Sequence, residues 1–342
     1  MPDERSRSTE DVPVTDGSRV TASLTSPATA AGPDRQPADG SPTGIGSPAI
    51  VRNPTKFADL GRATTEVEAA FAEQGLPAPR WYETTQDDPG QDQTRAAVED
   101  GADVVIAQGG DGTVRACAAA LAGGGVPLGL LPAGTGNLLA RNLGIPRDLD
   151  GAVATLVAGS RRDVDLVELD GEPFVVMGGS GFDAELFAGT SDELKDSIGW
   201  GAYVVSGVRT LRRTRSQRVL VEINGQRIRR RAVGVVVGNV GTLTGGIELL
   251  PDAEAQDGRL HVAVLTPVKA RHWAGLTARL LLRRDPHPVQ MTVLRGPDVT
   301  ITWAGDVPVE LDGDLVEPRR LLAFRVRPGR LSVYAPAGTD PA

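Results

Sequence analysis

The chain has 342 residues, of which 40% are apolar, so it is long enough for about two domains with buried cores. Its net charge of −8 argues against general nucleic-acid binding. A single cysteine, Cys117, excludes an intramolecular disulfide, and three scattered histidines exclude a His/Cys metal site. No apolar run reaches the roughly 20 residues that span a bilayer, so we expect a cytoplasmic protein whose membrane contact is at most peripheral, at the inner face.

The first half of the chain predicts a disordered tail followed by an α/β domain. Residues 1–46 are rich in Pro, Ser, Thr, Gly and Asp and lack an apolar core. Residues 47–162 alternate short apolar runs with helix-length segments, which is typical of a parallel sheet with helices on both faces. Strands are expected over 49–52, 80–82, 104–107 and 128–131, and helices over 58–74, 93–100, 114–121 and 137–143.

Residues 163–337 have a different character and predict a mostly antiparallel β-sandwich, because strand-like runs are joined by turns such as Asn224-Gly225. Helices are expected near 197–211 and 268–284, and the last strand is a candidate to return to the first domain. The active site should lie between the domains. Strands are expected over 164–169, 174–177, 218–223, 232–237, 260–265, 289–294, 299–303 and 321–326.

Two glycine-rich turns each follow a predicted strand and precede a predicted helix. The first reads Gly-Gly-Asp-Gly-Thr over 109–113, and the second reads Pro-Ala-Gly-Thr-Gly-Asn over 132–137. Helix N-termini present free N–H groups and favour negative charge, and glycine lets an anion come close to the backbone. The pair therefore predicts a nucleotide phosphate site. Neither a Walker loop nor a dinucleotide-binding fingerprint is present.

With these turns and several later motifs, the chain resembles the diacylglycerol kinase catalytic-domain family from about residue 49 to 336. NAD kinases and phosphofructokinases share the first turn, but the second turn and the later motifs favour the lipid kinases. The other motifs are Asn53-Pro54-Thr55, Gly181-Phe182-Asp183-Ala184-Glu185, Gly238-Asn239, Gly245-Gly246, Pro251-Asp252-Ala253, Asp257-Gly258 and Leu311-Asp312-Gly313-Asp314.

The resemblance implies a kinase that depends on ATP and Mg²⁺ and transfers the γ-phosphate to the hydroxyl of diacylglycerol or a related lipid. The second domain would then bind the lipid, and a homodimer is compatible with the sequence. Two alternatives stay open: a kinase for a soluble small molecule, of the NAD kinase type, and an inactive nucleotide or lipid sensor.

Site residues follow from the resemblance by matching motifs. Asp314 would be the catalytic base and Asp111 would position Mg²⁺, while Thr84 is an alternative to Thr85 at the nucleotide. A second, structural Mg²⁺ would be held by Glu254, Asp257 and Arg259, although Asp-Gly is also a common turn. The nucleotide-binding residues would be Asn53, Pro54, Thr55, Lys56, Phe57, Thr85, Gly109, Gly110, Asp111, Gly112, Thr113, Val114, Arg115, Ala116, Gly134, Thr135, Gly136 and Asn137.

Three residues depart from the family pattern. Asp314 stands where the family usually has Glu, Ala116 where many relatives have Glu, and Leu138 where some have Asp. The shorter Asp314 side chain loses about 1.5 Å of reach. These departures are the reason to keep the sensor alternative.

A cluster of arginines shares its segment with one acid, Glu222. It is either a solvated face with scattered ion pairs or a surface that attracts anionic lipid. Its members are Arg209, Arg212, Arg213, Arg215, Arg218, Arg227, Arg229, Arg230 and Arg231.

Overall fold

The structure, a computed structural model, describes residues 44–181, 216–243, 248–250, 252–266, 272, 279 and 290–337. The predicted helix near 197–211 and nearly all of that near 268–284 lie outside this part of the chain, as do residues 182–185, 245–246 and 251 of the motifs. Four arginines of the cluster, at 209, 212, 213 and 215, also lie outside it. Among the described residues, no helix is long and apolar enough to span a bilayer.

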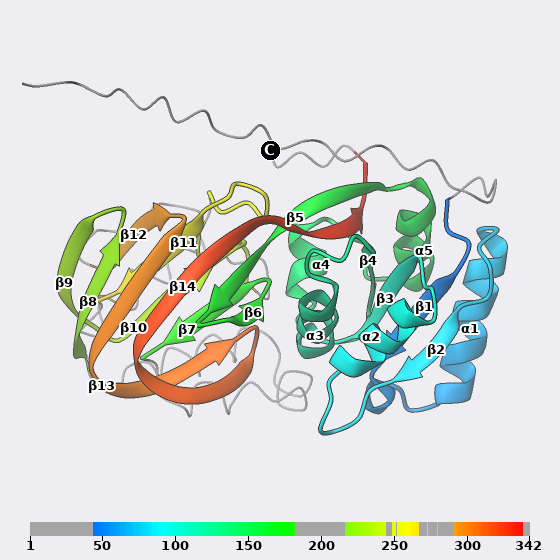
Figure 1. Cartoon of the computed structure of the whole chain (residues 1–342), viewed down its shortest axis with the longest axis horizontal. Coiled ribbons are helices and arrows are strands. Elements are labelled where there is room, and N and C mark those ends of the chain that lie inside the picture. The colour runs from blue at the N-terminus through cyan, green and yellow to red at the C-terminus, as the bar shows by residue number, and fades with distance from the viewer. Residues whose placement is uncertain are drawn as a thin grey trace, which may run out of the picture. The chain divides into compact units, whose positions relative to one another are not determined.

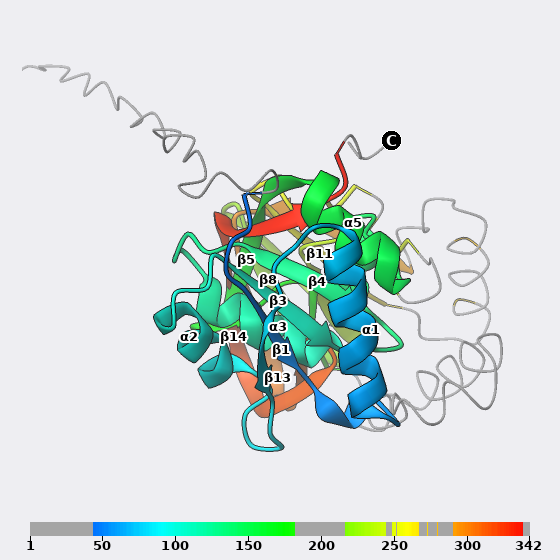
Figure 2. The same cartoon turned by 90° about the vertical axis from the view of Figure 1, so that its right-hand side faces the viewer.

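The first half of the described chain is a parallel sheet in the order β4-β3-β1-β2, as its alternating pattern predicts. Helices cover both faces, with α1 and α2 on opposite sides of the strands (Figure 2). Helix α5 was not among the predicted elements. The strands are β1 (Pro48–Arg52), β2 (Arg80–Glu83), β3 (Val104–Gly109) and β4 (Leu128–Pro132); the helices are η1 (Pro54–Lys56), α1 (Leu60–Glu73), α2 (Gln91–Glu99), α3 (Asp111–Leu121), α4 (Leu138–Asn142) and α5 (Leu149–Ala158).

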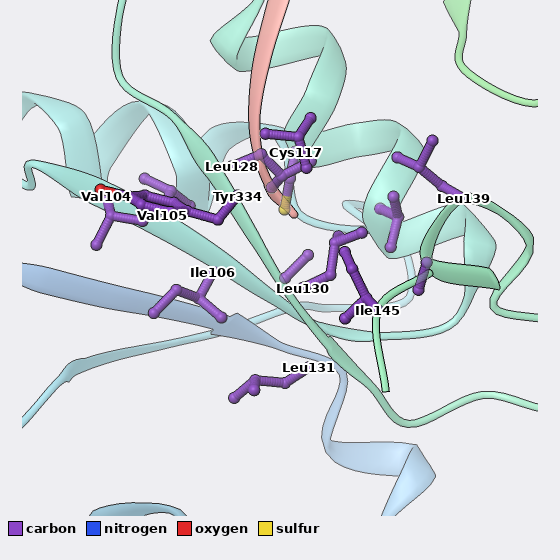
Figure 3. Close-up of a cluster of buried hydrophobic side chains, with 14 of the residues drawn as sticks. Val104, Val105, Ile106, Cys117, Leu128, Leu130, Leu131, Leu139, Ile145 and Tyr334 are labelled. Atoms are coloured by element: carbon purple, nitrogen blue, oxygen red, sulfur yellow. The ribbon is translucent and has the colours of Figure 1, made fainter. Parts of the chain in front are cut away.

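The core of this half forms around β3 and β4, whose apolar side chains are buried on both faces. Continuous burial explains why these strands read as unbroken apolar runs. Cys117 of α3 and Tyr334 of β14 pack in the same cluster (Figure 3). Burial raises the pKa of the Cys117 thiol to about 12, so this cysteine is a packing residue and not a nucleophile.

The second half is an antiparallel β-sandwich, which confirms the predicted fold class (Figure 1). Its core includes Trp303 and an edge-to-face pair of Phe174 and Phe324, with ring centroids 6.0 Å apart. The strands are β5 (Ser160–Leu169), β6 (Glu172–Phe174), β7 (Met177–Ser180), β8 (Gln217–Ile223), β9 (Gln226–Ala232), β10 (Gly234–Gly238), β11 (Leu260–Leu265), β12 (Met291–Gly296), β13 (Asp298–Leu311) and β14 (Asp314–Ala335).

The last strand, β14, belongs to both halves. It pairs antiparallel with β13 near its start and with β5 farther along, and Val333 near its end pairs with Leu128 of the parallel strand β4. Figure 1 shows this strand in red, running from the sandwich to the α/β half. One hydrogen-bonded network therefore connects the strands of both halves.

One strand prediction was wrong in detail, and one strand was missed. The predicted strand 174–177 is broken, because the N–H groups of Val175, Val176 and Met177 bond to the Asp312 carboxylate, which turns the chain between β6 and β7. Residues 226–232 form β9, which the sequence pattern did not reveal, because four of its seven residues are arginines. Strand β9 pairs only with β8 in the described chain and is therefore an edge strand.

Candidate nucleotide-binding and catalytic site

The two glycine-rich turns lie against each other at the carboxyl ends of β3 and β4. The Ala133 N–H donates to the Gly109 carbonyl over 3.1 Å. A Cβ on Gly134 would lie 2.8 Å from the Gly110 Cα, closer than real Cβ contacts, so glycine is required for this approach. The predicted pair of anion-binding turns thus forms one continuous surface of backbone.

Asn137 fixes the shape of the second turn. It is buried, it has a left-handed backbone (φ 46°), and it is the N-cap of α4. Its Oδ1 accepts from the Gly134 N–H over 3.1 Å, and its Nδ2 donates to the Gly134 carbonyl over 2.5 Å. The Asn137 side chain therefore holds the turn from inside, and Gly134 and Thr135 remain on the partly exposed side.

The Asp111 carboxylate connects the two turns. Asp111 begins α3, and its Oδ1 accepts from the Leu138 N–H at the start of α4 over 2.7 Å. A Cβ on Gly136 would come within 2.3 Å of the Asp111 Oδ2, so the second turn passes directly over this carboxylate. A hard divalent cation prefers oxygen donors of this kind, so the Asp111 carboxylate has the ligand chemistry for the Mg²⁺ that the resemblance implies.

Asp314, the first residue of β14 in the sandwich, also lies beside the start of α3. Asp312 (φ 50°) and Gly313 (φ 98°) form a two-residue turn between β13 and β14, in which Leu311 pairs with Asp314. The Asp314 Oδ2 lies 2.7 Å from the Arg115 Nη2 and 3.3 Å from where a Cβ on Gly112 would be. The two predicted catalytic carboxylates, Asp111 and Asp314, are thus brought to the first turn of α3. The Asp314 side chain is 51% exposed and open to a substrate.

The segment that follows β1 flanks the glycine turns. Asn53 caps η1, accepting from the Thr55 N–H over 3.0 Å, and its own N–H donates to the Gln108 carbonyl over 3.0 Å. The Cε of Lys56 lies 3.8 Å from where a Cβ on Gly110 would be. Pro54 belongs to η1 and Phe57 is its C-cap, so the predicted residues 53–57 adjoin the first turn.

Other predicted nucleotide residues differ in their access to a ligand. Thr113, Val114 and Ala116 are buried on the inner side of α3, so their side chains pack in the domain. Thr84 is buried and Thr85 is exposed, bonded to Asp88 within its own turn. Of the two threonines, Thr85 is the one that a ligand could reach.

The residues of the predicted structural metal site bond to one another and to a histidine. The Asp257 Oδ1 accepts from the Arg259 N–H over 2.8 Å, and its Oδ2 lies 2.6 Å from the Nε2 of His261, which was not considered from the sequence. The Glu254 carbonyl accepts from the Asp257 N–H over 3.3 Å. Both carboxylate oxygens of Asp257 thus have partners within the protein, and a cation bound here would have to share or displace them, so the metal role of these residues stays a prediction.

Asp312, in the turn between β13 and β14, and Glu310, at the end of β13, are two further acids near Asp314, and neither was assigned a role from the sequence. Asp312 is buried and accepts from three backbone N–H groups of residues 175–177, at 2.8 to 2.9 Å. Burial raises the pKa of Asp312 to about 6, while those N–H groups lower it, so the group is ionised above neutral pH. Glu310 accepts from the Gly313 N–H and closes the turn that carries Asp314. Both acids precede the predicted base in the same hairpin, Asp312 by two residues and Glu310 by four. This spacing is the sequence signal that could have indicated a role for them.

Glu310 should make the stability of the protein depend on pH. Burial, together with the Asp312 and Asp314 carboxylates, raises the pKa of Glu310 from its ordinary value of 4.5 to about 8. The folded chain therefore binds a proton that the unfolded chain has lost, and stability falls as the pH rises from 4.5 through 8. We expect Glu310→Gln to remove about 1–3 kcal/mol of this fall, measured by urea unfolding at several pH values.

The matched control for Glu310→Gln is Glu317→Gln, because Glu317 is an exposed glutamate on β14. That variant should keep the pH dependence of the wild type. Equal slopes for the wild type and Glu310→Gln across this range would show that Glu310 does not hold a proton.

Comparison with known proteins agrees with the geometry. The family model of the diacylglycerol kinase catalytic domain matches residues 49–169, and that of the YegS C-terminal NAD kinase beta sandwich-like domain matches residues 176–335. The chain belongs to the diacylglycerol kinase catalytic-domain family. This confirms the resemblance seen in the sequence and places this diacylglycerol kinase-family protein among phosphotransferases with an alcohol acceptor.

The relatives of this family member align with about two thirds of the chain. Probable lipid kinase YegS-like of Pseudomonas aeruginosa strain PAO1 is 34% identical over 238 residues, which are 69% of this chain and 77% of that protein. The protein of the same name from Pseudomonas putida is 32% identical over 237 residues, 69% and 78% of the two chains. A crystal structure of a diacylglycerol kinase from Bacillus anthracis matches with a TM-score of 0.66 at 20% identity and covers 86% of this chain and 98% of that one, which shows a shared fold.

Proposed function

We propose that this protein is a lipid kinase that transfers the γ-phosphate of ATP to the hydroxyl of diacylglycerol or a related lipid. The observation that carries the proposal is the meeting of Asp314, from the sandwich, with the glycine turn that holds Asp111. Phosphoryl transfer needs phosphates held in line, charge neutralised, and a base near the attacking hydroxyl. Relatives named lipid kinases support the substrate class.

The phosphates would lie over the paired turns, where the backbone N–H groups at the start of α3 and on the second turn gather. Lys56, beside Gly110, adds a positive charge at that surface. Mg²⁺, when bound, would be held by the Asp111 carboxylate and would neutralise charge on the phosphate oxygens.

Asp314 would accept the proton of the lipid hydroxyl. The hydroxyl oxygen then forms a bond to the γ-phosphorus, the bond from that phosphorus to the bridging oxygen breaks, and ADP leaves. Arg115 positions the Asp314 carboxylate through their 2.7 Å ion pair. Asp314 is exposed enough to meet a hydroxyl that enters from the sandwich side.

The test is transfer of labelled γ-phosphate from ATP, with Mg²⁺, to diacylglycerol, sphingosine, ceramide and monoacylglycerol in mixed micelles, with NAD as the soluble acceptor. We expect one lipid to be phosphorylated, with no transfer when EDTA removes Mg²⁺. Transfer to NAD alone would favour the soluble-substrate alternative. ATP binding by calorimetry without transfer to any acceptor would favour the sensor.

A further inference from the structure

The strands β9, β8, β13 and β14 lie side by side in one sheet (Figure 1). One face of these strands is buried in the sandwich core, and the alternate residues on the other face are partly or fully exposed. On β8, Val219, Val221 and Ile223 point inward and are buried. Because side chains alternate along a strand, the intervening residues point outward. The outward residues of β8 and β9 are Arg218, Leu220, Glu222, Arg227, Arg229 and Arg231.

The outer face of β8 and β9 is strongly positive. Glu222, the one acid in these two strands, is paired with Arg227 over 2.5 Å. Arg218 stands directly opposite Arg231 across the two strands, and both are exposed. Like charges in such a pair disfavour a sheet, although the Arg231 guanidinium also donates to the Ser216 carbonyl over 2.8 Å, and a negative surface over the two arginines would be attracted to both.

The arginines border a row of residues that contains two leucines. In the register of the sheet, Arg229 pairs with Leu220, Leu220 with Thr302, and Thr302 with Leu321, so these four residues form one row across four strands. Leu321 is 57% exposed. The adjacent row ends in Thr300 and the exposed Ala323. Charged residues alone could protect an edge strand from aggregation, but that need does not explain an exposed leucine beside them.

We propose that this arginine face, defined by Arg218, Arg229 and Arg231 together with Leu220 and Leu321 of the row beside them, docks on an anionic membrane surface. A bilayer presents phosphate charge above an apolar layer, which matches arginines beside exposed leucine. The inference rests on the proposed function in one respect, since a lipid kinase must meet its substrate at a membrane. It adds the surface that makes the contact.

The test compares two triple variants with equal loss of charge. Arg218→Gln/Arg229→Gln/Arg231→Gln changes the arginine face, and Arg62→Gln/Arg95→Gln/Arg147→Gln changes three exposed arginines of the α/β half. Each protein is sedimented with vesicles of phosphatidylcholine alone or mixed with phosphatidylglycerol, at low and high salt. Each basic residue close to an anionic surface strengthens binding by about fivefold, so the face variant should bind the mixed vesicles about 10- to 100-fold more weakly.

The control triple should bind mixed vesicles within about twofold of the wild type, and high salt should weaken the wild type. Equal vesicle binding by the wild type and the face variant would overturn the proposal. Thermal melting checks folding, and removal of the opposed Arg218 and Arg231 should not lower the melting temperature.

Vesicle binding is read without catalysis, so it stands apart from the proposed kinase activity. Phosphorylation of a short-chain, water-soluble diacylglycerol should be unchanged in the face variant if only docking is lost. Vesicle binding that depends on the arginines without turnover on any lipid would refute the kinase and leave the docking surface intact.

Discussion

Replacing Asp314 with Asn should lower the turnover number by about 10²–10⁴-fold while ATP affinity changes by less than about threefold. The amide cannot accept the proton of the attacking hydroxyl, but it keeps the size of the side chain. The backbone surface formed by the glycine turns does not depend on that carboxylate. The measurement is initial velocity with the lipid that the acceptor panel identifies, together with ATP binding by calorimetry.

Two matched variants sharpen the Asp314 experiment. Asp314→Glu restores the residue usual in the family and should keep turnover within about tenfold, since the carboxylate remains and only its reach changes. Asp306→Asn alters an exposed aspartate of the neighbouring strand β13 and should have no effect. Turnover in Asp314→Asn within a factor of ten of wild type would exclude Asp314 as the base.

Replacing Asp312 with Ala should lower the free energy of unfolding by about 3–5 kcal/mol. The Asp312 carboxylate is the acceptor for three N–H groups, those of Val175, Val176 and Met177, at the break between β6 and β7. Without it these donors would be buried and unpaired. The same turn carries Asp314, so the variant should also lose activity below its melting temperature.

Urea unfolding at pH 7.5 measures the effect of Asp312→Ala. Asp306→Ala, at an exposed position on the adjoining strand β13, is the control and is expected to change stability by less than about 0.5 kcal/mol. A loss below 1 kcal/mol for Asp312→Ala would mean that other acceptors take up the three N–H groups. Asp312 would then not be needed to hold the turn between β13 and β14 against residues 175–177.

Much of the α/β half could be predicted because its signals are local. Apolar runs such as that of β3 are buried on both faces, and a glycine turn directly after a strand marks the anion site without knowledge of distant residues. The Asp-Gly pair at 312–313 likewise specifies a two-residue hairpin through its own backbone preferences. The ligand roles of these residues remain predictions.

What the sequence did not reveal depends on partners far along the chain. The break after Phe174 is caused by Asp312, which is 138 residues away from that position. The raised pKa of Glu310 comes from burial and from acids that only the folded turn brings close. His261 engages Asp257 because β11 begins beside that loop, and no local pattern distinguishes this pairing from a metal ligand set.

The course of β14 has a mechanical consequence. Its first residue is Asp314, beside the nucleotide turns, and near its other end Val333 is bonded to β4, the strand that leads into the second of those turns. Under the proposed function, the base and the phosphate surface are two points on one closed loop of covalent chain and hydrogen-bonded sheet. The pairing of β14 with β5 is interrupted between Arg327 and Leu331, where Gly329 has a positive φ of 58°. This bulge interrupts the ladder that connects Asp314 to β4, so under the proposed function it is the point at which the distance between the base and the phosphate surface would vary.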